Sequence, residues 1–269
     1  MNKKNYYKLC YELNKIFKRV SNNTELLPCL QSIAIIKENK QYYSQSYKIL
    51  NGNFILLKIL KSFFKNIFFF FIFVFIALFL KVFLLKKKKL NKIDFIFLSH
   101  GFKEINFKDN YFNYFKIYLK EKKRRFKTYF INQNSKVGLS KNNKLLSILN
   151  ISTIQIFEII YKIFCNFIIT FKLYFNEKNV KDKKTILYLL SNIISTSSLK
   201  NYLITYEILN LLKTSEAKYF FFTFEGFVYE KYLMATINKS KILKTKTYGY
   251  QNTGLRQTVN SLINLNNKL

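Results

Sequence analysis

The chain contains 269 residues, with 46 lysines and arginines, 14 acidic residues and a formal net charge of +32. Only four of the basic residues are arginine, the side chain that base readers and phosphate forks favour, and the excess of Lys, Asn, Ile, Phe and Tyr is typical of A/T-rich coding sequences. We therefore expect no nucleic-acid partner. The alternative, a basic nucleic-acid binder, would show steep salt-dependent binding to any duplex. One histidine and three widely spaced cysteines argue against a zinc site or a disulfide framework and favour a reducing compartment.

Residues 1–53 form a polar, lysine-rich N-terminal region with a partly helical pattern and without the apolar core and cleavage site of a signal peptide. Residues 54–89 are predicted to be an apolar, membrane-associated helix. Within it, the segment 67–85 has 19 residues, about 28 Å as a helix, which is close to the roughly 30 Å hydrocarbon thickness of a bilayer. The alternative is a buried core helix, because a helix that is apolar on every face requires either lipid or complete burial.

Lysines flank the apolar segment on both sides, so the positive-inside rule does not choose its orientation. The helix can span the bilayer, or it can dip into one leaflet and leave both flanks in the cytoplasm. In either case the basic residues would add to the attraction for anionic lipid.

Residues 90–255 alternate between short apolar runs and longer amphipathic segments. Strands are predicted at 93–98, 125–132, 185–190, 219–224 and 245–251, and helices at 110–123, 143–176, 198–213 and after Gly226. This order predicts an α/β fold, namely a Rossmann-like, mostly parallel five-stranded sheet with helices on both faces. Residues 256–269 are expected to be a short C-terminal tail.

Several polar residues follow the predicted strands, and ligands bind at the carboxyl ends of parallel strands. Glu225 and Gly226 follow one strand, His100 closes another, and Gln251 and Asn252 end a third. A carboxylate at the start of a helix is favoured by the helix dipole and would be ionised at neutral pH. The alternative is that Glu225 is only a helix-start residue and that His100 is structural.

Glu230 follows Glu225 by one helical turn, where it can bind substrate or pair with a neighbouring lysine in solvent. The sequence contains no GxGxxG, Walker lysine loop, GxSxG or HExxH motif, and no Asp-x-Asp pair, so no cofactor and no metal are expected.

The run TFEGFVYEK at 223–231, followed by GYQN at 249–252, resembles bacterial surface-carbohydrate (O-antigen or capsule) biosynthesis proteins of the GT-B glycosyltransferase type. In that family a strand ends in Glu-Gly, a Glu-Lys or Glu-Arg pair follows four or five residues later, and a later strand ends in Gly-Tyr-Gln-His. The chain departs from this pattern at Tyr229, where tryptophan is common, and at Asn252, where histidine is usual. The resemblance covers mainly residues 93–255.

The resemblance implies transfer of a sugar from a nucleotide-sugar donor to a glycan or lipid-linked acceptor, at the cytoplasmic face of the inner membrane. Glu225 or His100 would be the general base, and the other matching residues would bind or position substrate: Gly226, Glu230, Gln251 and Asn252. These residues would form the acceptor-side domain, with the donor domain in a separate C-terminal-half chain, so no transfer by residues 1–269 alone is expected. The alternative is a non-catalytic, membrane-anchored interaction subunit or an inactive gene fragment.

Overall fold

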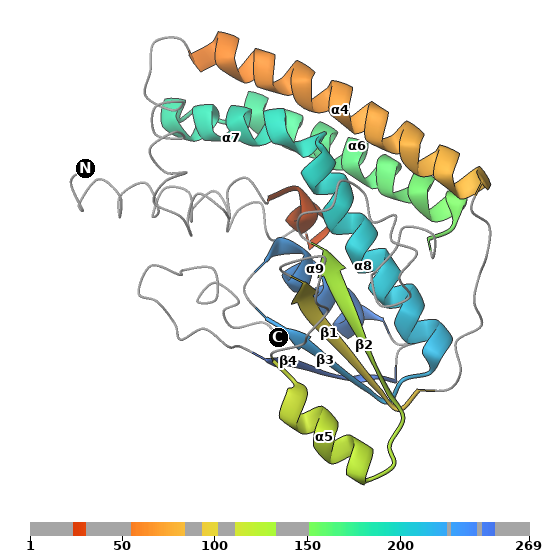
Figure 1. The fold of residues 1–269 in the computed structure, drawn as a ribbon. Coiled ribbons are helices and arrows are strands. Elements are labelled where there is room, and N and C mark those ends of the chain that lie inside the picture. The colour runs from red at the N-terminus through yellow and green to blue at the C-terminus, as the bar shows by residue number, and fades with distance from the viewer. Residues whose placement is uncertain are drawn as a thin grey trace.

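The computed structural model describes residues 24–30, 55–83, 93–101, 111–132, 151–224, 227–240 and 244–250. Within these ranges a parallel sheet lies beside a layer of long helices (Figure 1). In chain order the elements are η1 (Thr24–Leu30), α4 (Ile55–Phe83), β1 (Phe95–Gly101), α5 (Asn113–Glu121), β2 (Phe126–Asn132), α6 (Thr153–Asn176), α7 (Val180–Ile193), α8 (Thr196–Ser215), β3 (Tyr219–Thr223), α9 (Val228–Lys239) and β4 (Lys246–Tyr250).

The four strands of the described part have the order β2-β1-β3-β4, and every neighbouring pair is parallel. Aromatic and β-branched residues dominate the strands, as a pleated and largely buried surface favours. Helices α8 and α9 pack on one face, against side chains such as Ile96 and Phe222. Helix α5 packs on the other face, against Phe97. The predicted parallel α/β sheet with helices on both faces is therefore confirmed.

The prediction of a strand at 185–190, which would have made the sheet five-stranded, is wrong, because this segment lies within α7. Its run TILYLL has the apolar composition of a strand, but Ile186, Leu189, Leu190 and Ile193 recur at helical spacing. All four side chains are buried in the core that the long helices share. Tertiary packing of this helical stripe therefore determines the local structure.

Two of the helix starts have clear local causes. The Oγ of Ser152 accepts a hydrogen bond from Gln155 N (3.1 Å), and the Oε1 of Gln155 accepts one from Ser152 N (2.9 Å), so a capping box begins α6. The side chain of Ser195 likewise accepts from Ser198 N at the start of α8. These caps define where α6 and α8 begin.

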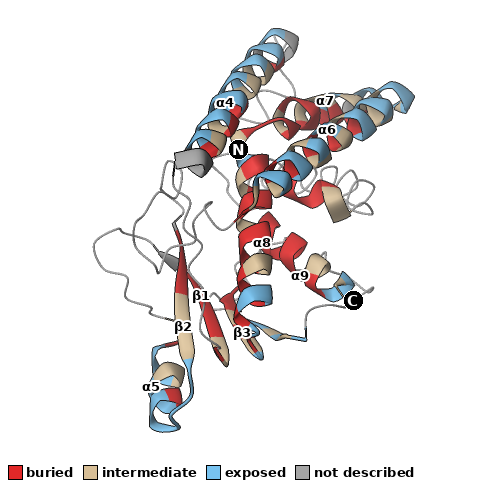
Figure 2. Ribbon diagram, turned by 90° about the vertical axis from the view of Figure 1, so that its right-hand side faces the viewer, coloured by how far each residue is buried: buried red, intermediate tan, exposed pale blue. Residues whose placement is uncertain are grey.

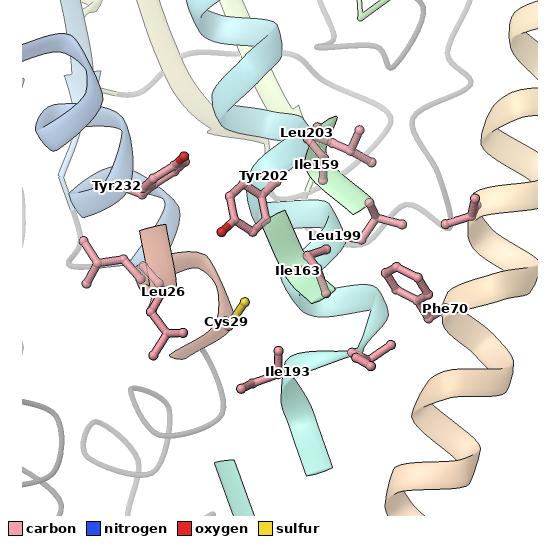
Figure 3. Packing of buried hydrophobic residues seen from close by; sticks show 14 of the residues in the cluster. Leu26, Cys29, Phe70, Ile159, Ile163, Ile193, Leu199, Tyr202, Leu203 and Tyr232 are labelled. Carbon is pink, nitrogen blue, oxygen red and sulfur yellow. The ribbon is translucent and has the colours of Figure 1, made fainter. Parts of the chain in front are cut away.

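Helix α8 belongs to two of the three apolar cores in the described part of the chain. Its first half contributes Leu199 and Tyr202 to the core shared with η1, α4, α6, α7 and α9 (Figure 3). Its second half contributes Ile208 and Leu211 to the core beneath the sheet. Figure 2 shows α8 as largely buried, whereas α4 and α6 are exposed along their outer sides. The helix thus fixes the helical layer against the sheet.

Candidate functional site

The carboxyl ends of β1, β3 and β4 lie side by side. Leu98 pairs with Phe222 across β1 and β3, so His100 lies two residues beyond that pair. Across β3 and β4, Thr223 pairs with Tyr250, and Phe224 N donates a hydrogen bond to the carbonyl of Tyr250 (2.8 Å). In parallel α/β sheets this edge is the usual place for a ligand.

Most of the predicted site residues follow these strands in the sequence. Glu225, Gly226, Gln251 and Asn252 are outside the described residues, which end at Phe224 after β3 and at Tyr250 in β4. His100 is described as a residue of β1, while its side chain is not. A common cleft for these side chains therefore stays a prediction.

Glu230 is the predicted site residue whose contacts are described, and it is completely buried. Its Oε2 accepts a hydrogen bond from Phe227 N (2.8 Å), and its Oε1 accepts one from the hydroxyl of Tyr229 (3.2 Å). A carboxylate at this position satisfies a free N–H and is favoured by the dipole of α9. Glu230 therefore fixes the start of α9, five residues after Glu225 in the sequence. Direct contact of Glu230 with substrate stays a prediction.

Gly249 of the Gly-Tyr-Gln motif has a packing reason to be glycine. A Cβ at this position would lie 3.3 Å from the Cβ of Phe224 and 3.4 Å from the Cζ of Phe222. These contacts are tighter than ordinary packing, so a larger side chain would push β4 away from β3. The glycine therefore maintains the strand pairing at the carboxyl edge.

A second feature is a polar cluster around Glu25, which sequence reasoning did not predict. The Oε2 of Glu25 accepts a hydrogen bond from the hydroxyl of Tyr232 (2.8 Å) and lies 3.2 Å from the Nζ of Lys162. Lys162 also pairs with the Oε1 of Glu158 (3.3 Å), which accepts a hydrogen bond from the hydroxyl of Tyr206 (2.6 Å). This Glu25 cluster connects η1 to α6, α8 and α9.

The backbone of η1 is held from the same side. Asn166 Nδ2 donates to the carbonyl of Glu25 (2.8 Å) and to the hydroxyl of Tyr202 (2.8 Å), and that hydroxyl also donates to the Glu25 carbonyl. Figure 3 shows the hydroxyl of Tyr202 directed toward η1, with Cys29 nearby. Buried polar groups with partners of this kind fix a unique arrangement of the elements they join.

The titration behaviour of the cluster favours a structural role. Burial, and then the hydrogen bond to Glu158, raise the pKa of Tyr206 to about 12. Burial also raises the pKa of Tyr202 and of Tyr232, and it raises the pKa of the Cys29 thiol to about 12. At neutral pH the three phenols are therefore protonated donors and the thiol is not nucleophilic. The i, i+4 spacing of Glu158 and Lys162 was visible in the sequence, but Glu25, the other partner of Lys162, lies more than 130 residues earlier in the chain.

A third feature is the apolar outer side of α4 and α6. Two segments, Ile59–Phe79 and Thr153–Asn176, are long and apolar enough to cross a bilayer, a test that buried helices of soluble proteins also pass. In both segments most residues are not buried within the protein. The sequence predicted membrane contact for the first segment, and it left two alternatives for the helix at 143–176, namely packing on the sheet or lying on the membrane.

No protein-family model matches the sequence, and neither the curated proteins nor the solved structures contain a match to it.

Proposed function

We propose that this protein is a membrane-associated, glycosyltransferase-like protein of bacterial surface-polysaccharide biosynthesis, at the cytoplasmic face of the inner membrane. The observation that carries the proposal is the adjacency of the carboxyl ends of β1, β3 and β4, because the residues that resemble the family's motif occur at these ends. In open parallel α/β sheets ligands bind at this edge, and a sugar acceptor bound there would meet the motif residues.

The position of this edge also supports the proposal. The arrowheads of β1 and β2 point toward the side of the molecule on which α4, α6 and α7 lie (Figure 1). If the outer side of α4 contacts lipid, an acceptor bound at the carboxyl edge is held on the membrane side of the sheet. That location suits a growing glycan attached to a lipid.

In the proposed reaction Glu225, or His100 in its place, removes the proton of an acceptor hydroxyl. The hydroxyl oxygen then forms a bond to the anomeric carbon of the donor sugar, and the bond from that carbon to the nucleotide diphosphate breaks. Gly226 would let the acceptor approach the backbone, and Gln251 and Asn252 would position it. Glu230 would act by holding the start of α9, since both of its oxygens accept protein hydrogen bonds.

The test is transfer of labelled sugar from a panel of nucleotide sugars to a lipid-linked acceptor, with the full chain and a complementing C-terminal-half chain together in bacterial membrane vesicles. We expect Glu225→Gln to lower the rate by roughly 10²–10⁴-fold, the range for loss of a general base, while acceptor binding is retained. The matched control is Glu121→Gln, because Glu121 is exposed at the end of α5, away from the carboxyl edge. Equal rates for Glu225→Gln and the unchanged chain would remove Glu225 from the mechanism.

A non-catalytic interaction subunit is the second candidate, favoured by the complete engagement of Glu230 with protein donors. It predicts that polysaccharide synthesis in cells requires the chain but tolerates Glu225→Gln. Loss of synthesis in cells that carry Glu225→Gln at normal protein level would contradict it.

A further inference from the structure

Large apolar side chains are exposed mainly on two helices of the described structure. Ten lie on α4 and eight on α6, and several are more than half exposed, such as Phe68 (63%), Phe75 (69%) and Tyr161 (70%). Solitary exposed apolar residues are ordinary, but contiguous apolar surfaces mark an interaction site. The set is Leu57, Leu60, Phe64, Phe68, Phe69, Phe71, Ile72, Phe75, Ile76 and Phe79 of α4, with Ile154, Phe157, Tyr161, Phe164, Ile168, Ile169, Phe171 and Phe175 of α6.

The two helices belong to one packed body. The rings of Phe63 and Phe167 stack at 5.8 Å, and those of Phe70 and Phe164 meet edge to face at 6.5 Å, so the helices run antiparallel. The direction follows because the residue number rises from 63 to 70 along α4 while that of the contacted residue falls from 167 to 164 along α6. We name the exposed apolar sides of these two helices together the α4–α6 surface.

One side of α4 is occupied by protein. Phe70, Val74 and Ala77 are buried in the shared core, and Asn66 Nδ2 donates a hydrogen bond to the carbonyl of Ser191 in α7 (2.9 Å). A helix that crosses the bilayer alone would have lipid on every side. Because α4 does not, its neighbours would have to enter the hydrocarbon with it.

Those neighbours carry charges that hydrocarbon disfavours. Helix α6 contributes the ion pairs of Lys162 with Glu158 and with Glu25, and the first turn of α7 contains Asp182 beside two lysines. Glu158 and Lys162 lie on the flank of α6 that faces η1 and α8. Ionised residues of this kind are rare inside a membrane because they lose their hydration there. Contact of the outer side alone with lipid avoids that cost.

We propose that the α4–α6 surface is a monotopic docking site for one leaflet of an anionic bilayer, so that α4 lies in the interface and does not cross the membrane. Charge complementarity favours lipid over a second copy of the chain. The protein carries a net charge of +32, and the exposed lysines at 61 and 65 in α4 and at 172 in α6 lie beside the apolar side chains. Lysines at such positions extend toward headgroup phosphates. Two copies of the chain would instead bring like charges together.

The contribution of α6 is tested by flotation of the full chain with vesicles of phosphatidylglycerol and phosphatidylethanolamine. We expect Phe157→Glu combined with Ile168→Glu to lower the vesicle-bound fraction at least tenfold, although α4 is unchanged. The control is Ile117→Glu on α5, since Ile117 is also exposed but lies elsewhere. Unchanged binding by the α6 variant with unchanged circular dichroism would overturn the proposal, as would a soluble dimer that does not bind vesicles.

The monotopic arrangement is tested by cysteine labelling at both flanks, with Asn53→Cys and Asn91→Cys introduced separately after replacement of Cys10 and Cys165 by serine. We expect a membrane-impermeant maleimide to label both positions in inverted inner-membrane vesicles and neither in spheroplasts. Labelling of one flank from the periplasmic side would show that α4 spans the membrane and would refute the inference. Neither vesicle flotation nor cysteine labelling depends on sugar transfer, so both experiments test the monotopic docking site even if the proposed function is wrong.

Discussion

At the scale of single residues, Glu230 shows how a motif residue acquires a structural role. The family resemblance implied a substrate ligand at this position, and the alternative was a lysine pair in solvent. The carboxylate is completely buried and accepts hydrogen bonds from Phe227 N and the Tyr229 hydroxyl. Removal of an acceptor from a buried site leaves donors without a partner, and this costs more than the hydrogen bond itself contributes.

We therefore expect Glu230→Ala to lower the free energy of unfolding by about 1–3 kcal/mol. Urea denaturation followed by circular dichroism would measure this change, with Glu121→Ala as an exposed control that shifts stability by less than about 0.5 kcal/mol. Glu230→Ala with unchanged stability and lost acceptor binding would instead identify Glu230 as a substrate ligand.

At the scale of elements, α4 combines two environments along one helix. Phe70 is fully buried against α6 and the shared core, while Phe68 is 63% exposed on the opposite side. The sequence IFFFFIFVFIALFL is apolar all round, so it does not distinguish these sides. Deletion of residues 63–89 would remove core side chains as well as the outer ones, so it would not test membrane contact alone.

Single substitutions separate the two environments. We expect Phe70→Ala to lower the free energy of unfolding by about 3–5 kcal/mol, because it leaves a cavity in the core. Phe68→Ala should change stability in water by less than about 0.5 kcal/mol and reduce vesicle binding instead. Urea denaturation and vesicle flotation of both variants measure the contrast, and equal losses of stability would show that the outer side of α4 is also packed.

At the scale of the whole molecule, η1 joins residues that are far apart in the chain. Leu26 and Cys29 are buried in the core of the long helices, and the Glu25 cluster connects the same segment to α6, α8 and α9. Burial of Cys29 raises the pKa of its thiol from 9.0 to about 12. The neutral thiol is thus favoured more in the folded state than in the unfolded chain.

This shift predicts that stability decreases in alkaline solution. A pKa that is raised on folding contributes stability that is complete below pH 9, the pKa of the unfolded thiol, and is lost as the pH rises toward about 12. At pH 10 the loss from Cys29 is about 1.4 kcal/mol. Urea denaturation at pH 8, 9 and 10 should show this decrease, and Cys29→Ala should flatten it. An identical pH dependence in the variant would show that the thiol does not contribute.

Local patterns determined the strands and most of the helices. The runs at 93–98, 125–132, 219–224 and 245–251 correspond to β1–β4, and the apolar segment and the helices after it follow their predicted order. These elements could be predicted because burial on two faces of a strand or one face of a helix leaves a periodic trace in the residues themselves.

The tertiary structure decided what local patterns leave open. Residues 185–190 are helical because their apolar stripe packs between η1, α4 and α6, and a run of six residues carries too little periodicity to show this. Glu25 acquires Lys162 and Tyr232 as partners only when η1 meets α6 and α9. The side of α4 that is buried depends on its contact with α6 and α7. Each of these outcomes depends on residues distant in the chain, so only the packed arrangement defines it.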